Sequence, residues 1–147
     1  MDSRIAKLGQ SPRLVEWTLR FARLALAAAF LSAVADRLGL WGPLETPGVD
    51  WGSMPRFYAD VAALNPWLPE AMIPALAWFV TIVEAILGVL LITGPYVRAS
   101  AFASGVLLLA FAIAMTLFLG PKLPLNYSVF TAAACAFLVA FVPRKAG

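Results

Sequence analysis

Apolar residues fill four long stretches of the chain, separated by polar segments or by short Gly–Pro breaks. A helix that crosses a bilayer needs about 20 consecutive, mostly apolar residues. The stretches that qualify as spans lie at about residues 17–40, 71–93, 97–119 and 127–142. This pattern predicts an all-α, polytopic membrane protein: a four-transmembrane-helix bundle that forms one domain over residues 1–147.

Proline marks the ends of the predicted spans. Gly42-Pro43, Gly94-Pro95 and Gly120-Pro121 follow the first three spans, and Pro143 closes the fourth. Proline lacks a backbone donor and clashes with the preceding turn, so it ends helices instead of continuing them. Ser11-Pro12 is a favourable helix start, with Ser11 as the N-cap, so we expect the first helix to begin there.

The long connection over residues 41–70 predicts one short amphipathic helix, at about residues 55–64. Phe57, Val61 and Leu64 share one face of that helix. Tryptophan favours the membrane interface, and the connection carries Trp41, Trp51 and Trp67. We expect an interfacial helix in the first extracytoplasmic loop, lying flat on the bilayer. The alternative is a lid or partner-docking surface over the bundle.

The composition fits a membrane protein and excludes several other classes. Hydrophobic residues make up 62% of the chain and charged residues 13%, against about 45–50% and about 25% in soluble domains. An ordinary cytosolic enzyme, a disordered chain and a nucleic-acid-binding module are excluded. The lipid bilayer is the expected partner, and we expect no nucleic acid.

The sequence has no histidine and a single cysteine, Cys135. Imidazole-ligated haem, His-based zinc sites and His-dependent nucleophile pairs therefore cannot be built, nor can a dithiol pair or a thiolate-held iron–sulfur cluster. We expect no metal site and no cofactor that the chain holds on its own. Cys135 lies in an Ala-rich apolar span, where we expect it to be inert packing.

Basic residues predict the orientation. If both termini share one side, that side carries eight of the eleven Lys and Arg residues: Arg4, Lys7, Arg13, Arg20, Arg23, Arg98, Arg144 and Lys145. The other side carries Arg37, Arg56 and Lys122. The positive-inside rule then places both termini in the cytoplasm of a bacterial cell, with the chain in the inner membrane.

Glu84 and Arg23 are the ionisable residues that lie deepest in the predicted spans. Glu84 is nine residues from the end of the second span, which is about 13–14 Å and close to the midplane. Arg23 lies about 8–9 Å deep in the first span. We expect these two side chains to form an ion pair, either a structural clasp or a site for a polar headgroup or a proton-coupled step.

A second candidate site lies at the outer ends of the spans. Asp36 and Arg37 end the first span, and Asn126 and Tyr127 precede the fourth. These residues are either ordinary interfacial residues or the parts of one outward-facing ligand site. No catalytic residue is assigned.

Small residues recur every four positions in three of the spans, which predicts close helix packing. The repeats are Ala25, Ala29 and Ala33; Ala101 and Gly105; and Ala132, Ala136 and Ala140.

Several short motifs resemble the DoxX family of small four-span membrane proteins, over about residues 19–142. The first span carries Arg23, Phe30 and Arg37 at seven-residue intervals. The second motif is Glu84-Ala-Ile-Leu-Gly88, followed by Gly94 and Arg98-Ala99, and the segment 120–130 resembles one branch of the family. The chain departs from the family pattern at Ala27, Val34 and Arg37. The resemblance implies a link to quinone-coupled sulfur oxidation or to complexes that protect against oxidative stress.

Two functions from different classes are therefore expected. The first is a membrane subunit of a quinone- or lipid-linked redox system, in which Glu84 and Arg23 supply polar contacts. Aromatic walls would come from Phe79, Phe111 and Tyr127, and a redox partner protein would transfer the electrons. The alternative is a non-catalytic small-molecule-binding or scaffold membrane protein. A solute transporter is less favoured because no inverted repeat is evident, and a homo-oligomer is left open.

Overall fold

The computed structural model describes residues 11–143, and every regular element within them is a helix. This result confirms the all-α prediction for the described part of the chain. In chain order the elements are α2 (Pro12–Arg37), α3 (Met54–Leu64), the 3₁₀ turn η1 (Glu70–Met72), α4 (Ile73–Thr93), α5 (Val97–Leu119), α6 (Lys122–Asn126) and α7 (Val129–Phe141).

The helix ends follow the proline and glycine signals. Proline occupies the first turn of α2, α3 and α4. Ser11 is the N-cap of α2, although its side chain makes no capping hydrogen bond. Gly94 ends α4 with a φ of 97°, a left-handed conformation that glycine adopts without strain.

Within residues 11–143, three helical segments are long and apolar enough to cross a membrane: Pro12–Arg37, Glu70–Thr93 and Val97–Leu119. The chain is therefore a multi-pass membrane protein. Within the predicted fourth span the helix is the 13-residue α7, and Ser128, with a φ of 55°, lies in the turn that separates α7 from α6. Helix α7 alone is about 20 Å long, shorter than a hydrocarbon core of about 30 Å. A fourth crossing thus stays a prediction.

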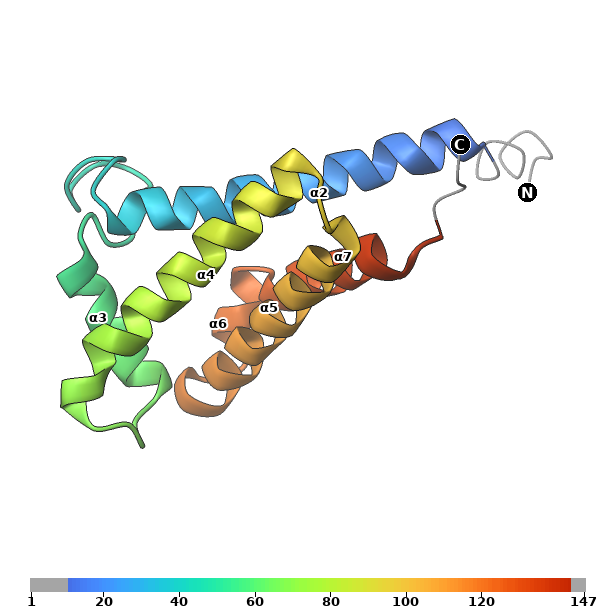
Figure 1. Cartoon of the computed structure of the whole chain (residues 1–147). Helices are drawn as coiled ribbons and strands as arrows, with labels where there is room; N and C mark the ends of the chain where they lie inside the picture. Colours follow the sequence, from blue (N-terminus) through green and yellow to red (C-terminus); the bar gives the residue numbers. More distant parts are fainter. Residues whose placement is uncertain (1–10, 144–147) are drawn as a thin grey trace.

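The long helices pack as two pairs, α2 along α4 and α5 along α7, and the pairs meet through α4–α5 and α2–α7 contacts (Figure 1). One glycine in each pair permits the close approach of the two helices. A Cβ atom at Gly88 of α4 would lie 2.8 Å from Cγ of Leu31 on α2. A Cβ atom at Gly105 of α5 would lie 2.7 Å from the Phe137 ring on α7.

The small-residue repeats differ in how far the structure buries them. Ala101 and Ala136 are fully buried where α5 and α7 pack, as expected from their spacing. In α2 the prediction is wrong, because Ala25 and Ala29 are exposed and Ala27 is the alanine that is fully buried. A repeat predicts a small-residue face, but the neighbouring helix covers a different face of α2.

Helix α3 packs on the bundle. Phe57 and Val61 are buried, 6% and 5% exposed, in a cluster with Ile73, Ala77 and Val80 of α4. The predicted amphipathic helix is therefore present, but these two apolar side chains face α4 and not the bilayer. We call α3 together with residues 50–53 the outer cap.

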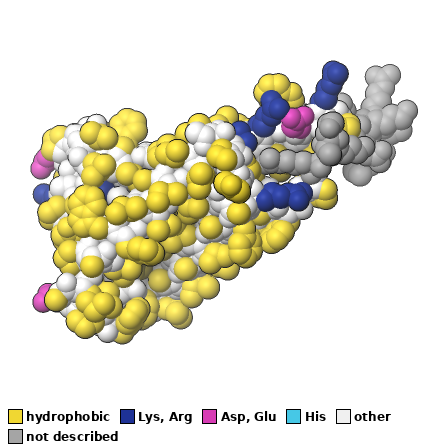
Figure 2. All heavy atoms as spheres, in the orientation of Figure 1, with side chains coloured by type: hydrophobic (Ala, Val, Ile, Leu, Met, Phe, Trp, Pro, Cys, Tyr) yellow, Lys and Arg dark blue, Asp and Glu magenta, His cyan; other side chains and the backbone are white. Residues whose placement is uncertain are grey.

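The ends of the molecule differ in charge. Figure 2 shows Lys and Arg side chains gathered at the end where α2 begins, and a broad apolar surface between the two ends. Four residues used in the orientation argument, Arg4, Lys7, Arg144 and Lys145, lie outside the described residues.

Candidate functional site

A small set of buried polar residues on α4 lies between two apolar clusters. The inner cluster joins α2, α4, α5 and α7 and includes Leu87 and Leu91 of α4. The outer cluster joins α3 and α4 and includes Ala77 and Val80. Thr81 and Glu84 are buried polar residues of α4, and they lie between the α4 residues of the outer cluster and those of the inner cluster. These polar residues therefore lie where the outer cap meets the helix bundle.

Arg37, the last residue of α2, forms a buried ion pair with Glu84. The two residues are 4% and 3% exposed. Nη1 of Arg37 donates to Oε2 of Glu84 and also to Oγ1 of Thr81, at 3.2 Å. The Thr81 hydroxyl donates in turn to the carbonyl oxygen of Ala77, at 2.8 Å. This network gives both charges a partner, which a buried ion pair needs to be tolerated.

Two aromatic rings of the outer cap cover the Arg37 guanidinium. Its Cζ lies 3.8 Å from the ring centroid of Phe57 and 4.9 Å from that of Trp51. The Trp51 ring is itself fixed, because its Nε1 donates to Oδ2 of Asp60 at 2.7 Å. Cation–π attraction is strongest where water is excluded. Arg37 therefore holds α4 by its charge and the outer cap by its planar face.

Arg23 is not the partner of Glu84, so the predicted pairing is wrong. Nη1 of Arg23 lies 3.8 Å from a Cβ position built on Gly94, at the end of α4. Gly94 is ten residues from Glu84, which is about 15 Å along the helix. Helical side chains lean towards the N-terminus of their own helix. In this antiparallel pair Arg37 and Glu84 therefore lean towards each other, and Arg23 leans away from Glu84.

Asp36 organises the loop before α3. Its Oδ2 accepts from the backbone N–H of Asp50 at 2.8 Å. Its Oδ1 accepts from the N–H groups of Trp51, at 3.3 Å, and Gly52, at 2.8 Å. Asp36 is 5% exposed. One buried carboxylate thus fixes the backbone that carries the Trp51 ring over Arg37.

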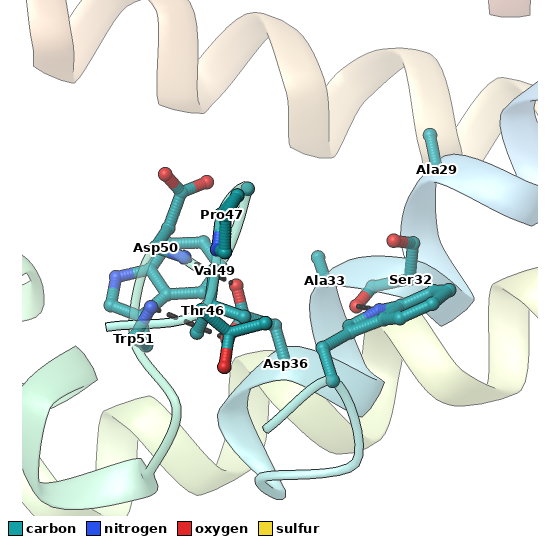
Figure 3. Close-up of a pocket in the computed structure, with 11 residues that line it drawn as sticks. Ala29, Ser32, Ala33, Asp36, Thr46, Pro47, Val49, Asp50 and Trp51 are labelled. Carbon is teal, nitrogen blue, oxygen red and sulfur yellow. Dashed lines mark hydrogen bonds between the residues drawn. The ribbon is translucent and has the colours of Figure 1, made fainter. Parts of the chain in front are cut away.

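An open pocket of about 510 Å³ lies between α2 and this loop. We call it the outer pocket. Figure 3 shows Ala29, Ser32, Ala33 and Asp36 along α2, with Asp36 beside the loop residues. The pocket is lined by Ala29, Ser32, Ala33, Asp36, Trp41, Thr46, Pro47, Gly48, Val49, Asp50 and Trp51.

The other predicted site residues do not join this arrangement. Asn126 and Tyr127 are exposed where α6 ends, and among the described residues no hydrogen bond joins either side chain to Asp36 or Arg37. The expected aromatic walls do not form either. Phe79 and Tyr127 are 64% and 62% exposed, whereas Phe111 packs against the outer cluster.

Sequence reasoning missed the residues that complete the ion pair, Thr81, Phe57 and Trp51. Thr81 lies three residues before Glu84, a spacing that places both side chains on one helix face, and this signal was available. Phe57 and Trp51 were expected at the membrane interface. Nothing in their local sequence indicates that they cover an arginine.

The comparisons with known proteins gave a match to a family model. The family model of methylamine utilisation protein MauE matches residues 15–126. Neither the curated proteins nor the solved structures gave a match. The DoxX resemblance is therefore wrong, since the matching family is a different one. The motifs behind it are single residues set in apolar helices, too short a pattern to separate families of small membrane proteins.

Proposed function

The chain belongs to the MauE family, and on that premise we propose that it is an inner-membrane component of a methylamine-utilisation system or of a related redox system. The match covers more than half of the chain. It runs from α2 to the end of α6 and so includes the outer cap and both members of the Arg37–Glu84 pair.

Within such a system we infer that the chain binds or positions other components and leaves electron transfer to a partner protein. The sequence holds no histidine and one cysteine, so it supplies neither imidazole ligands nor a dithiol pair. The observation that carries the proposal is the Arg37–Glu84 pair, because its charges are already occupied by each other, by Thr81 and by two rings. Such a pair suits a structural clasp that holds the outer cap in place.

A growth experiment tests the proposal. The gene is deleted in the source organism, and growth is compared with methylamine and with ammonium as the nitrogen source. We expect the deletion to abolish growth on methylamine alone and the intact gene to restore it. Undiminished growth of the deletion strain on methylamine would overturn the assignment to methylamine utilisation and leave the related redox system.

The same strain tests the role of the clasp. Glu84→Gln keeps the size of the side chain and its acceptor oxygen but cannot carry the charge. If the pair is a clasp, we expect Glu84→Gln to reduce growth in proportion to the loss of folded protein in the membrane. A variant present at the normal level that still fails to support growth would assign Glu84 a direct role in function.

A further inference from the structure

We propose that the outer pocket binds an ammonium group. The choice of methylammonium as the free ligand rests on the proposed function, but the site itself is argued from the lining of the pocket. The lining has three features that an ammonium group requires: net negative charge, free acceptor capacity and aromatic faces.

The charge of the lining is negative. Its ionisable residues are Asp36 and Asp50, and no Lys or Arg lines the pocket. Arg37 follows Asp36 directly, but its guanidinium is paired with Glu84 on α4. The adjacent positive charge is thus already neutralised, and it leaves the Asp36 carboxylate uncompensated.

Asp36 retains capacity to accept a further hydrogen bond. Its Oδ1 accepts two backbone N–H groups, whereas its Oδ2 accepts only that of Asp50. A carboxylate offers about four acceptor positions over its two oxygens. The Asp50 side chain points away from Asp36 in Figure 3, so Asp36 is the carboxylate that we assign to the ligand. The hydroxyl-bearing residues Ser32 and Thr46 also line the pocket and offer further acceptors.

The remaining walls suit the carbon atoms of an organic cation. Trp41 and Trp51 line the pocket. The Trp51 ring already lies against Arg37, so the indole that we assign to the ligand is that of Trp41. An indole ring is the best aromatic partner of a cation. Ala29, Ala33 and Val49 add small apolar surface. A carboxylate beside aromatic and apolar walls favours an alkylammonium ion over an inorganic cation, which would keep its water shell.

Two sources supply this chemistry. One is free methylammonium. The other is the ethanolamine headgroup of a phospholipid, because the pocket reaches Ala29 on an exposed face of α2 that continues to Ala25. Both ligands place an ammonium group beside Asp36.

The experiment uses the full chain in nanodiscs made only of phosphatidylglycerol. Methylammonium chloride is titrated by calorimetry, with sodium chloride at equal ionic strength and methanol as the cation and neutral controls. Ala29→Phe adds a ring at a lining position about two helical turns from Asp36. Ala25→Phe places the same ring one turn away on the exposed face, outside the pocket lining, and is the matched control.

We expect saturable binding of methylammonium to the wild type and to Ala25→Phe, and binding about tenfold weaker or more in Ala29→Phe and in Asp36→Asn. If ethanolamine lipid is the ligand, nanodiscs containing phosphatidylethanolamine retain that lipid on the wild type and lose it on Ala29→Phe, as measured by native mass spectrometry.

Equal binding by Ala29→Phe and Ala25→Phe, or no binding of either ligand to the wild type, would overturn the ammonium site. Neither result bears on the growth phenotype of the deletion strain, so failure of the site and failure of the proposed function are distinguishable.

Discussion

Asp36 and Arg37 are neighbours in the sequence, but their side chains hold different parts of the molecule. Asp36 accepts the backbone N–H groups of residues 50–52, and Arg37 pairs with Glu84 on α4. The two contacts meet again at Trp51, whose backbone binds Asp36 and whose ring lies against Arg37. The last turn of α2 therefore joins the outer cap to the bundle.

Removing one member of the Arg37–Glu84 pair should strand the other charge. Arg37→Met and Glu84→Leu keep much of the buried apolar volume, and we expect each single variant to cost about 3–5 kcal/mol. The double variant should recover most of this loss, because two apolar side chains replace a compensated pair. Thermal unfolding in detergent measures all three variants.

Arg23→Met is the matched control, since among the described residues Arg23 takes part in no ion pair. It should lower the melting temperature far less than Arg37→Met. Strictly additive losses in Arg37→Met/Glu84→Leu would contradict the pairing.

Asp36→Ala should release the loop before α3 and leave the helices in place. Three backbone N–H groups lose their acceptor, and a hydrogen bond to a charged group contributes about 1.5–3 kcal/mol. Hydrogen exchange should accelerate at residues 50–52 and in α3, with little change in α5 and α7. Protection that is unchanged at residues 50–52 would show that the carboxylate does not hold the loop.

Gly105→Val should weaken the α5–α7 pair. A Cβ atom at this position already lies 2.7 Å from the Phe137 ring, and overpacking of this kind costs about 1–3 kcal/mol. Ala103→Val, on the exposed side of α5, is the control. Combining Gly105→Val with Phe137→Ala should restore part of the melting temperature in detergent. If the melting temperature does not recover, the Phe137 ring is not the group that clashes with the valine.

The positive-inside prediction can be tested by labelling single cysteines in a Cys135→Ala background. Ala63→Cys lies on the exposed face of α3 and should react with an impermeant maleimide in intact cells. Ser11→Cys should react only after the inner membrane is permeabilised. The opposite labelling pattern would invert the proposed orientation.

The fourth crossing has its own test. Three crossings would put the two ends of the chain on opposite sides of the membrane, whereas four would return the C-terminus to the cytoplasm. A protease-cleavable tag after Gly147 should therefore resist external protease in spheroplasts and become sensitive on lysis. Cleavage in intact spheroplasts would show that α7 does not cross.

The helices were predictable because their signals are local. The residues of α5 coincide with the predicted third span, since Gly94-Pro95 and Gly120-Pro121 lie at its two ends. A long apolar stretch between two such breaks has little alternative to a helix in a membrane. The predicted fourth span was less secure, because its first two residues, Tyr127 and Ser128, form a turn before α7 with no proline or glycine to signal it.

The partner of Glu84 was not predictable, because it depends on how α2 slides along α4. Depth measured separately from the end of each span favours Arg23, but the contact between Gly88 and Leu31 shows the actual register. That register brings the last turn of α2 beside Glu84. The same applies to the alanine repeat of α2, whose spacing defines a face but not the neighbour that covers it.

The long separation between Arg37 and Glu84 has a consequence for biogenesis. The partners are 47 residues apart, so α2 is synthesised and inserted well before α4 exists. During that interval the guanidinium has no carboxylate to meet and must stay in the aqueous or headgroup layer. Arg37 becomes buried only when Glu84 is present to pair with it. The outer cap can therefore close only after α4 is inserted, because its two rings cover the paired Arg37. Closure of the outer cap is thereby timed by the insertion of α4.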